Sequence, residues 1–121
     1  MLKKVLVVED YEDVAKMVTR LLQHCGYDAR HAADGPTAIT LVQEWQPEVI
    51  LLDVGLPGID GYEVARRIRQ QPWGEKICLI AATGWGQDKD KALAEEAGFD
   101  YHLTKPINFQ ELGQLLSKKI T

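Results

Sequence analysis

The sequence has no long hydrophobic run, no excess of basic residues and only two cysteines among its 121 residues. No apolar stretch approaches the roughly 20 residues that a membrane-spanning helix needs, so no membrane association is expected. The N-terminus, MLKKVLVVEDYED, lacks the longer apolar segment and the cleavage site of a signal peptide. The formal net charge is -4 and there is no basic stripe, which argues against nucleic acid as a direct partner.

The two cysteines, Cys25 and Cys78, fall in a predicted helix and a predicted strand. Two unpatterned cysteines in a chain without a secretion signal favour small buried thiols over a disulfide or a metal site. The length fits a single domain, residues 1–121, with one core. These features together predict a cytoplasmic domain.

Short, continuous apolar runs predict buried strands. Residues 6–8, 49–52 and 77–82 are apolar throughout and are flanked by turn residues, as in a parallel sheet covered on both faces. Residues 28–32 and 100–103 have mixed polarity, which suits the edges of the sheet.

Helical periodicity fills the gaps between these strands. Helix ends are indicated by Gly26 and by two cap-like pairs, Asp60 with Glu63 and Asn108 with Glu111. The strict alternation of strand and helix predicts an α/β fold, a doubly wound parallel sheet with right-handed crossovers. The expected helices cover 14–25, 36–45, a segment opened by Asp60, 91–97 and a segment opened by Asn108.

Polar residues stand where the predicted strands end. The first strand runs into Glu9 and Asp10, the third into Asp53, the fourth into Thr83 and the fifth into Lys105. Ligands of such sheets bind outside the carboxyl ends of the strands, near the point where strand order reverses. If the order is 2-1-3-4-5, the first and third strands are neighbours about 4.8 Å apart, and their three acids crowd together.

Crowded carboxylates repel one another, and a divalent cation removes that conflict. Hard oxygen ligands with room for water suit Mg²⁺. A metal, the Lys105 ammonium, the Thr83 hydroxyl and a nucleophile together form a site for phosphoryl transfer. Asp53 is the preferred nucleophile because it is central, and Gly55 and Gly58 keep the approach to it open and let backbone groups come close.

The segments VLVVED, ILLDVGLPGIDGYE, AATG and LTKP, in this order, resemble the receiver domain of bacterial two-component response regulators. The resemblance runs from Lys3 to about Lys118 and implies a flavodoxin-like (βα)5 fold with strand order 2-1-3-4-5. It implies that Asp53 accepts a phosphoryl group from a phosphohistidine on a sensor histidine kinase or a histidine phosphotransfer protein. It also implies a cis peptide bond at Lys105-Pro106.

The same resemblance implies the roles of the site residues. Asp10, Asp53 and the carbonyl of Gly55 would hold Mg²⁺, with Glu9 binding directly or through water. Lys105 would pair with the phosphoryl oxygens, and Thr83 would hydrogen-bond to them. The partner would dock near Val14–Val18 and Pro106–Ile107, and an output face, whose protein target the sequence does not name, would combine the fourth helix, the strand with Tyr101 and His102, and the fifth helix.

The sequence departs from the family pattern at two positions. His102 stands where relatives carry Tyr or Phe as a switch residue, so we expect coupling that is sensitive to pH; a plain surface histidine is the alternative. Gly55 leaves no side chain over the phosphoryl site, so water or a partner has freer access. Met1 and the closely fitted ends favour a protein that stands alone over a domain cut from a longer chain.

Simpler interpretations and rival functions remain open at this point. Glu9 and Asp10 could cap the first helix, and His24 and His31 read as surface residues. One rival is a receiver-fold adaptor that is not phosphorylated. Another is an aspartyl-nucleophile phosphatase, whose second acid would stand at the place of Gly55. A flavin-binding module is disfavoured because EDYED would repel a phosphate.

Aromatic residues suggest packing or contact. Trp45 should pack at a helix end, and Trp73 should anchor its loop, whereas Trp85, beside the site, suits partner contact and loop anchoring equally. We therefore expect a phosphorylatable signalling switch that catalyses its own modification and has no separate substrate.

Overall fold

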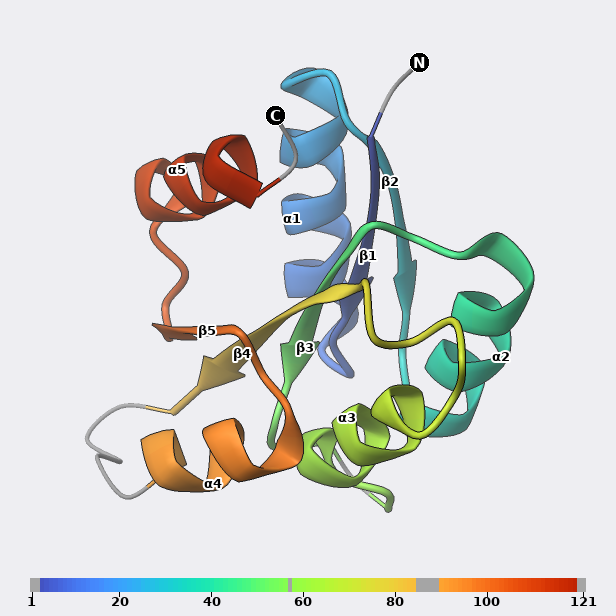
Figure 1. Ribbon diagram of the computed structural model, residues 1–121. Helices are drawn as coiled ribbons and strands as arrows, with labels where there is room; N and C mark the ends of the chain where they lie inside the picture. The colour runs from blue at the N-terminus through green and yellow to red at the C-terminus, as the bar shows by residue number, and fades with distance from the viewer. Residues whose placement is uncertain (1–2, 57, 85–89, 120–121) are drawn as a thin grey trace.

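The computed structural model describes residues 3–56, 58–84 and 90–119 of the chain. Strands and helices alternate along it, as the sequence predicts (Figure 1). Helix starts and ends differ from the predicted ones by at most two residues where the ends can be compared, and the ends at Trp45 and Ala97 agree. The elements are β1 (Lys4–Val8), α1 (Glu12–His24), β2 (Asp28–Ala32), α2 (Gly35–Trp45), β3 (Val49–Asp53), α3 (Gly61–Arg69), β4 (Cys78–Thr83), α4 (Asp90–Ala97), β5 (Tyr101–Thr104) and α5 (Phe109–Lys119).

The five strands form one parallel sheet in the order β2-β1-β3-β4-β5. This confirms the predicted flavodoxin-like, doubly wound fold. Strand order reverses between β1 and β3, where Val8 is in register with Leu52. Glu9, which directly follows β1, and Asp53, the last residue of β3, therefore lie side by side at the carboxyl edge of the sheet.

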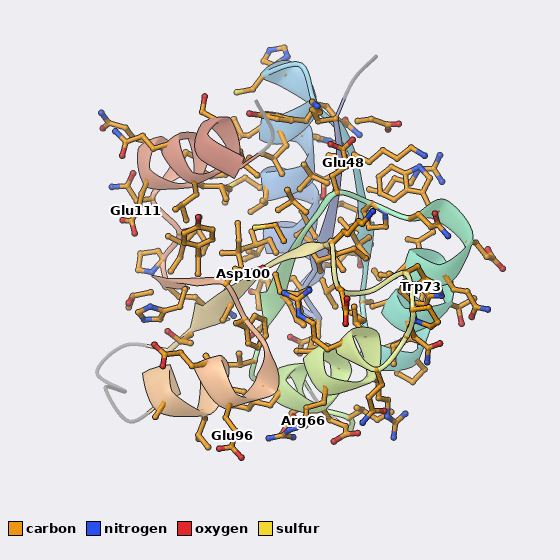
Figure 2. The ribbon with its side chains drawn as sticks, in the orientation of Figure 1. Glu48, Arg66, Trp73, Glu96, Asp100 and Glu111 are labelled. Carbon is orange, nitrogen blue, oxygen red and sulfur yellow. The ribbon has the colours of Figure 1, made fainter. Side chains whose placement is uncertain are left out.

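Helices cover both faces of the sheet, with α1 and α5 on one face and α2, α3 and α4 on the other (Figure 1). Every residue of β3 and β4 is buried, which explains their continuous hydrophobicity. Alternate residues supply two cores. Leu6, Ile50 and Leu79 face α2–α4, while Val7, Leu51 and Ile80 face α1 and α5. Glu96 of α4 and Glu111 of α5 lie at the outer edge of the molecule (Figure 2).

Capping side chains fix the starts of three helices. The Glu63 N–H donates to Asp60 Oδ1 at 3.0 Å, and the Glu111 N–H donates to Asn108 Oδ1 at 3.1 Å, so both predicted cap pairs are confirmed. Asp34 caps α2 in the same way, through the Thr37 N–H at 2.8 Å. The prediction began this helix at Pro36 and missed that cap.

The predicted burial of both thiols is wrong for Cys25. Cys78 is buried in β4, but Cys25 is exposed and follows the last residue of α1 rather than lying within the helix. The α1 stripe that faces the sheet passes through Ala15, Val18 and Leu22, and the helix ends before the next inward position. Gly26 turns the chain with a φ of 94°, as expected beyond a helix end.

Two tryptophans pack as predicted. Trp45 is 8% exposed at the end of α2, with the charged groups of Lys4 and Arg30 over its ring. Trp73 is half-buried against the core and anchors the loop before β4 (Figure 2). Trp85 lies outside the described residues. Within the ranges that the structure describes, no helix has the length and apolar character required to span a bilayer.

Candidate functional site

Three acidic side chains meet at the carboxyl edge of the sheet. Glu9, Asp10 and Asp53 each place a carboxylate oxygen within 4.8 Å of the other two. Glu9 and Asp53 are only 8% and 5% exposed, whereas Asp10 faces solvent. The register between β1 and β3 produces this cluster, because pairing Val8 with Leu52 brings the next residues of the two segments, Glu9 and Asp53, to the same level.

Lys105 joins the cluster from the end of β5. Its Nζ lies 2.9 Å from Asp53 Oδ2 and 3.2 Å from Glu9 Oε2. Its backbone N–H donates to the Thr83 carbonyl at 2.8 Å, which ties the segment to β4. The Lys105-Pro106 peptide bond is cis, the geometry that the resemblance implied. The ammonium group of Lys105 thus contacts the carboxylates of two residues that are about fifty or more positions away in the sequence.

The turn after β3 holds the other oxygen of Asp53. The Gly55 N–H donates to Asp53 Oδ1 at 2.9 Å, so both carboxylate oxygens have a donor. Val54 N–H continues the ladder by donating to the Ala82 carbonyl at 3.2 Å. A Cβ added at Gly55 would meet only Asp53 Oδ1, at 3.5 Å, so the space beside the carboxylate is open.

Burial and proximity shift the pKa values of these groups in opposite directions. Burial, and next the neighbouring Asp53, raise the pKa of Glu9 from 4.5 to about 7, although Lys105 lowers it in part. Burial also raises the pKa of Asp53, but hydrogen bonds from Glu9, Lys105 and the Gly55 N–H outweigh it, so the pKa is lowered overall. Asp53 is therefore the ionised carboxylate, and Glu9 carries a proton for much of the time near neutral pH.

Lys105 stays protonated. Burial lowers the pKa of its ammonium group, but hydrogen bonding and attraction to Asp53, followed by Glu9, outweigh burial and raise the pKa. The site therefore combines the ionised carboxylate of Asp53, the protonated Lys105 and two further acids. Such a set can bind a divalent cation and an anionic group side by side.

Thr83 and His102 lie on β4 and β5, at the α4 side of the sheet. Thr83 is 2% exposed, and its hydroxyl donates to the Leu103 carbonyl at 3.4 Å, a long hydrogen bond. His102 is half-buried and in register with Ala81, two residues before Thr83. It lines a cavity of about 230 Å³ with Ala94 and Glu95 of α4. Thr83 follows Ala82, the register partner of Asp53, at the carboxyl end of β4, whereas His102 lies level with Ala81, two positions further from that edge.

The simpler interpretation of Glu9 and Asp10 fails. The residue at the N-cap of α1 is Tyr11, and its side chain caps nothing. His24 and His31 are exposed, as predicted.

The sequence did not reveal a cavity of about 530 Å³ that extends from Glu9, Asp53 and Lys105 between α1 and the segment after β5. Its walls are mostly apolar and include Val14, Val18, Ile107 and Phe109. Tyr11 and Met17, 63% and 51% exposed, lie at its rim. The available signal was the docking region that the resemblance implied, Val14–Val18 and Pro106–Ile107, parts of which line this cavity.

A family model described as the response regulator receiver domain matches residues 5–117. Solved structures are similar over nearly the whole chain. A Chloroflexus aurantiacus J-10-fl protein described as a response regulator is 34% identical, with a TM-score of 0.92, over 98% of this chain and 97% of the other. The Vibrio cholerae chemotaxis protein CheY4 is 29% identical, with a TM-score of 0.93, over 99% and 100% of the two chains.

A third similar structure is the receiver domain of the sensor histidine kinase PA1611 from Pseudomonas aeruginosa PAO1. It is 31% identical, with a TM-score of 0.90, over 99% of this chain and 98% of the other. That domain was solved with a magnesium ion coordinated in its active-site cleft. With its strand order, its acidic edge and a family match over most of its length, this chain belongs to the response regulator receiver domain family.

Proposed function

We propose that this receiver domain is the phosphoacceptor of a two-component or phosphorelay system, with Asp53 as the residue that takes the phosphoryl group. The observation that carries the proposal is the setting of Asp53. Its buried carboxylate receives the Gly55 N–H on one oxygen and the Lys105 ammonium on the other, next to two more acids. Proteins of this family act mainly as phosphoacceptor switches, in response regulators and in sensor kinases.

The donor set fits Mg²⁺. Carboxylate oxygens from Glu9, Asp10 and Asp53 lie within 4.8 Å of one another, and hard oxygen ligands are those that Mg²⁺ takes in proteins. The carbonyl of Gly55 is the fourth proposed ligand, and Glu9 acts directly or through water. When bound, the ion neutralises charge on the phosphoryl oxygens.

The positions of these residues support the following reaction. A carboxylate oxygen of Asp53 attacks the phosphorus of a phosphohistidine, a P–O bond forms, and the P–N bond breaks as the imidazole leaves with its electron pair. Lys105, now 2.9 Å from Asp53, pairs with the phosphoryl oxygens as the acceptor loses its charge. The Thr83 hydroxyl exchanges its long hydrogen bond to the Leu103 carbonyl for one to a phosphoryl oxygen.

His102 is the proposed second residue of the switch. It lies on the same face of the sheet as Thr83 and beside the α4 cavity, so it has room to turn when Thr83 moves. We propose, as expected from the sequence, that this coupling is sensitive to pH. NMR shifts of the His102 ring with and without phosphorylation, at two pH values, test this, and a ring that does not respond at either pH would contradict it.

The proposed donor is the helical bundle of a sensor histidine kinase or a histidine phosphotransfer protein, acting in the cytoplasm. The cavity beside Asp53, with the exposed Tyr11 and Met17 at its rim, supports docking along α1 and the Pro106–Ile107 segment. A helix that enters this groove brings its phosphohistidine to the acid cluster. The output face is proposed to be α4, β5 and α5, toward a protein target, without nucleic acid or membrane.

The two rival functions have less support. An unphosphorylated adaptor does not need a buried, fully hydrogen-bonded Asp53 opposite a lysine. A phosphatase of the aspartyl type would need an acid at position 55, where this chain has an exposed glycine. We therefore propose a switch that modifies itself and has no separate substrate.

Incubation with Mg²⁺ and a small acyl or amido phosphate, followed by intact-mass measurement, tests the proposal. The expected result is the addition of one phosphoryl group, absent in Asp53→Asn and present in the matched control Asp60→Asn, whose carboxylate only caps α3. Addition of no phosphoryl group from a competent donor would favour the adaptor.

A further inference from the structure

Gly61, the first residue of α3, lies against the backbone of the acceptor segment. Its N–H donates to the Val54 carbonyl at 3.2 Å. A Cβ added to Gly61 would lie 2.5 Å from Val54 Cα and 3.0 Å from Asp53 C, and would also clash with the Asp53 carbonyl oxygen. Ordinary van der Waals contact begins at about 3.4 Å, so the two segments would have to separate by roughly 0.9 Å. Space, rather than an unusual φ, requires glycine here.

The end of β3 has little freedom to make that room. Asp53 is in register with Ala82, and the Val54 N–H donates to the Ala82 carbonyl at 3.2 Å. Asp53 is also 5% exposed, so the strand end is enclosed. A shift of α3 would instead pull on the segment between Val54 and Gly61, and this segment carries the Gly55 N–H that holds Asp53 Oδ1 at 2.9 Å.

We propose that Gly61 is a positioning residue for phosphoryl acceptance. Its missing side chain lets α3 seat the Asp53–Gly55 turn, in which the Gly55 N–H donates to Asp53 Oδ1 at 2.9 Å. The inference rests on the proposed function. According to this inference, Gly61 affects the rate of phosphoryl acceptance as well as the stability of the fold. A misplacement of about 1 Å at a reacting group can cost on the order of 100-fold in rate.

The test compares Gly61→Ala with wild type and with Gly98→Ala. Gly98 lies at the opposite edge of the sheet, before β5. A methyl group is unfavourable there for two reasons: the φ of 103° strains any residue with a side chain, and a Cβ would lie 2.7 Å from Arg69 Cγ. Both variants add one methyl group at a crowded glycine. The measurements are the initial rate of phosphorylation by a small acyl phosphate, the Mg²⁺ dissociation constant by calorimetry, and the thermal midpoint.

Gly61→Ala should lose about 10- to 100-fold in rate and bind Mg²⁺ several-fold more weakly at temperatures where it is fully folded. Gly98→Ala should melt earlier than wild type yet keep both values within about two-fold. If Gly61→Ala is partly unfolded, the comparison is repeated in a stabilising osmolyte.

A folded Gly61→Ala with wild-type rate and Mg²⁺ affinity would overturn the inference. So would equal losses in both variants, or a Gly61→Ala chain that stays unfolded in the osmolyte, since the position would then serve only the fold. If the wild-type protein is not phosphorylated at all, the proposed function fails, and Mg²⁺ binding alone still tests the role of Gly61.

Discussion

Magnesium binding should release protons near neutral pH, because Glu9 has to ionise when a cation joins the cluster. The pKa of Glu9 is raised to about 7, chiefly by burial and by Asp53. At pH 7 about half of the free protein therefore carries the Glu9 proton, and binding should release about half a proton per ion. From pH 6 to pH 8 the ionised fraction of Glu9 rises from about one tenth to about nine tenths, so the Mg²⁺ affinity should rise by roughly ten-fold.

Isothermal titration calorimetry in two buffers of different ionisation enthalpy measures the proton release directly. The Glu9→Gln variant should bind Mg²⁺ more weakly but with little dependence on buffer or pH. Glu12→Gln is the matched control, because Glu12 is an exposed acid of α1 that pairs with Lys16 and lies outside the cluster. Binding heats that do not change with buffer in the wild type, or a pH dependence that persists in Glu9→Gln, would refute the reasoning.

Three further predictions concern the site and its scaffold. Without metal, the free energy of unfolding should fall by about 2 to 3 kcal/mol as pH rises from 4.5 to 7, because the raised pKa of Glu9 makes the folded state bind more protons than the unfolded state in this window. Urea titrations of wild type and Glu9→Gln check this, and the same change of unfolding free energy with pH in both proteins would contradict it. Lys105→Ala should slow phosphoryl acceptance by about 100-fold or more and destabilise the metal-free protein by about 1 to 3 kcal/mol, because two largely buried carboxylates lose their cation. Phosphorylation time courses measure the first effect and chemical denaturation the second, and an unchanged rate would argue against the proposed role of Lys105. Arg69→Ala should lower the free energy of unfolding by about 3 kcal/mol, because the guanidinium donates to the Gly98 and Ile77 carbonyls and to Asp100 at 2.7 to 2.9 Å. Phosphorylation of the folded variant should be unchanged, since these contacts lie at the opposite edge of the sheet. A slower phosphorylation without a loss of stability would be inconsistent with a purely structural role.

The strands, the helices and the acids at the strand ends could be predicted because each depends on local patterns, whereas the strand order came from the family resemblance. Continuous apolar runs such as 49–52 mark strands buried on both faces, and the cap pairs at Asp60 and Asn108 mark helix starts. Once the strands are in order, Asp10 and Asp53 must meet, because parallel strands end at one edge. The resemblance supplied the rest of the assignment, including the cis peptide bond before Pro106.

Other features depend on distances that a sequence does not encode locally. The raised pKa of Glu9 arises from its burial beside Asp53. The sequence predicted that the acids lie together, but it did not predict that the pKa would be raised for Glu9 and lowered for Asp53. The exposure of Cys25 reflects where α1 stops relative to the sheet, not the residue's own hydrophobicity. Nothing in the sequence indicated that Gly61 must lack a side chain, because this requirement arises from the contact between the start of α3 and the backbone of Asp53 and Val54.

The most direct measurement is the chemical identity of the modified residue. The protein is phosphorylated with Mg²⁺ and an acyl or amido phosphate, reduced with borohydride, which converts an aspartyl phosphate to homoserine, and sequenced by tandem mass spectrometry. The account predicts homoserine at position 53 and aspartate at position 10. Homoserine at another aspartate, the corresponding alcohol of a glutamate, or a stable phosphate on a serine, threonine or histidine would contradict it.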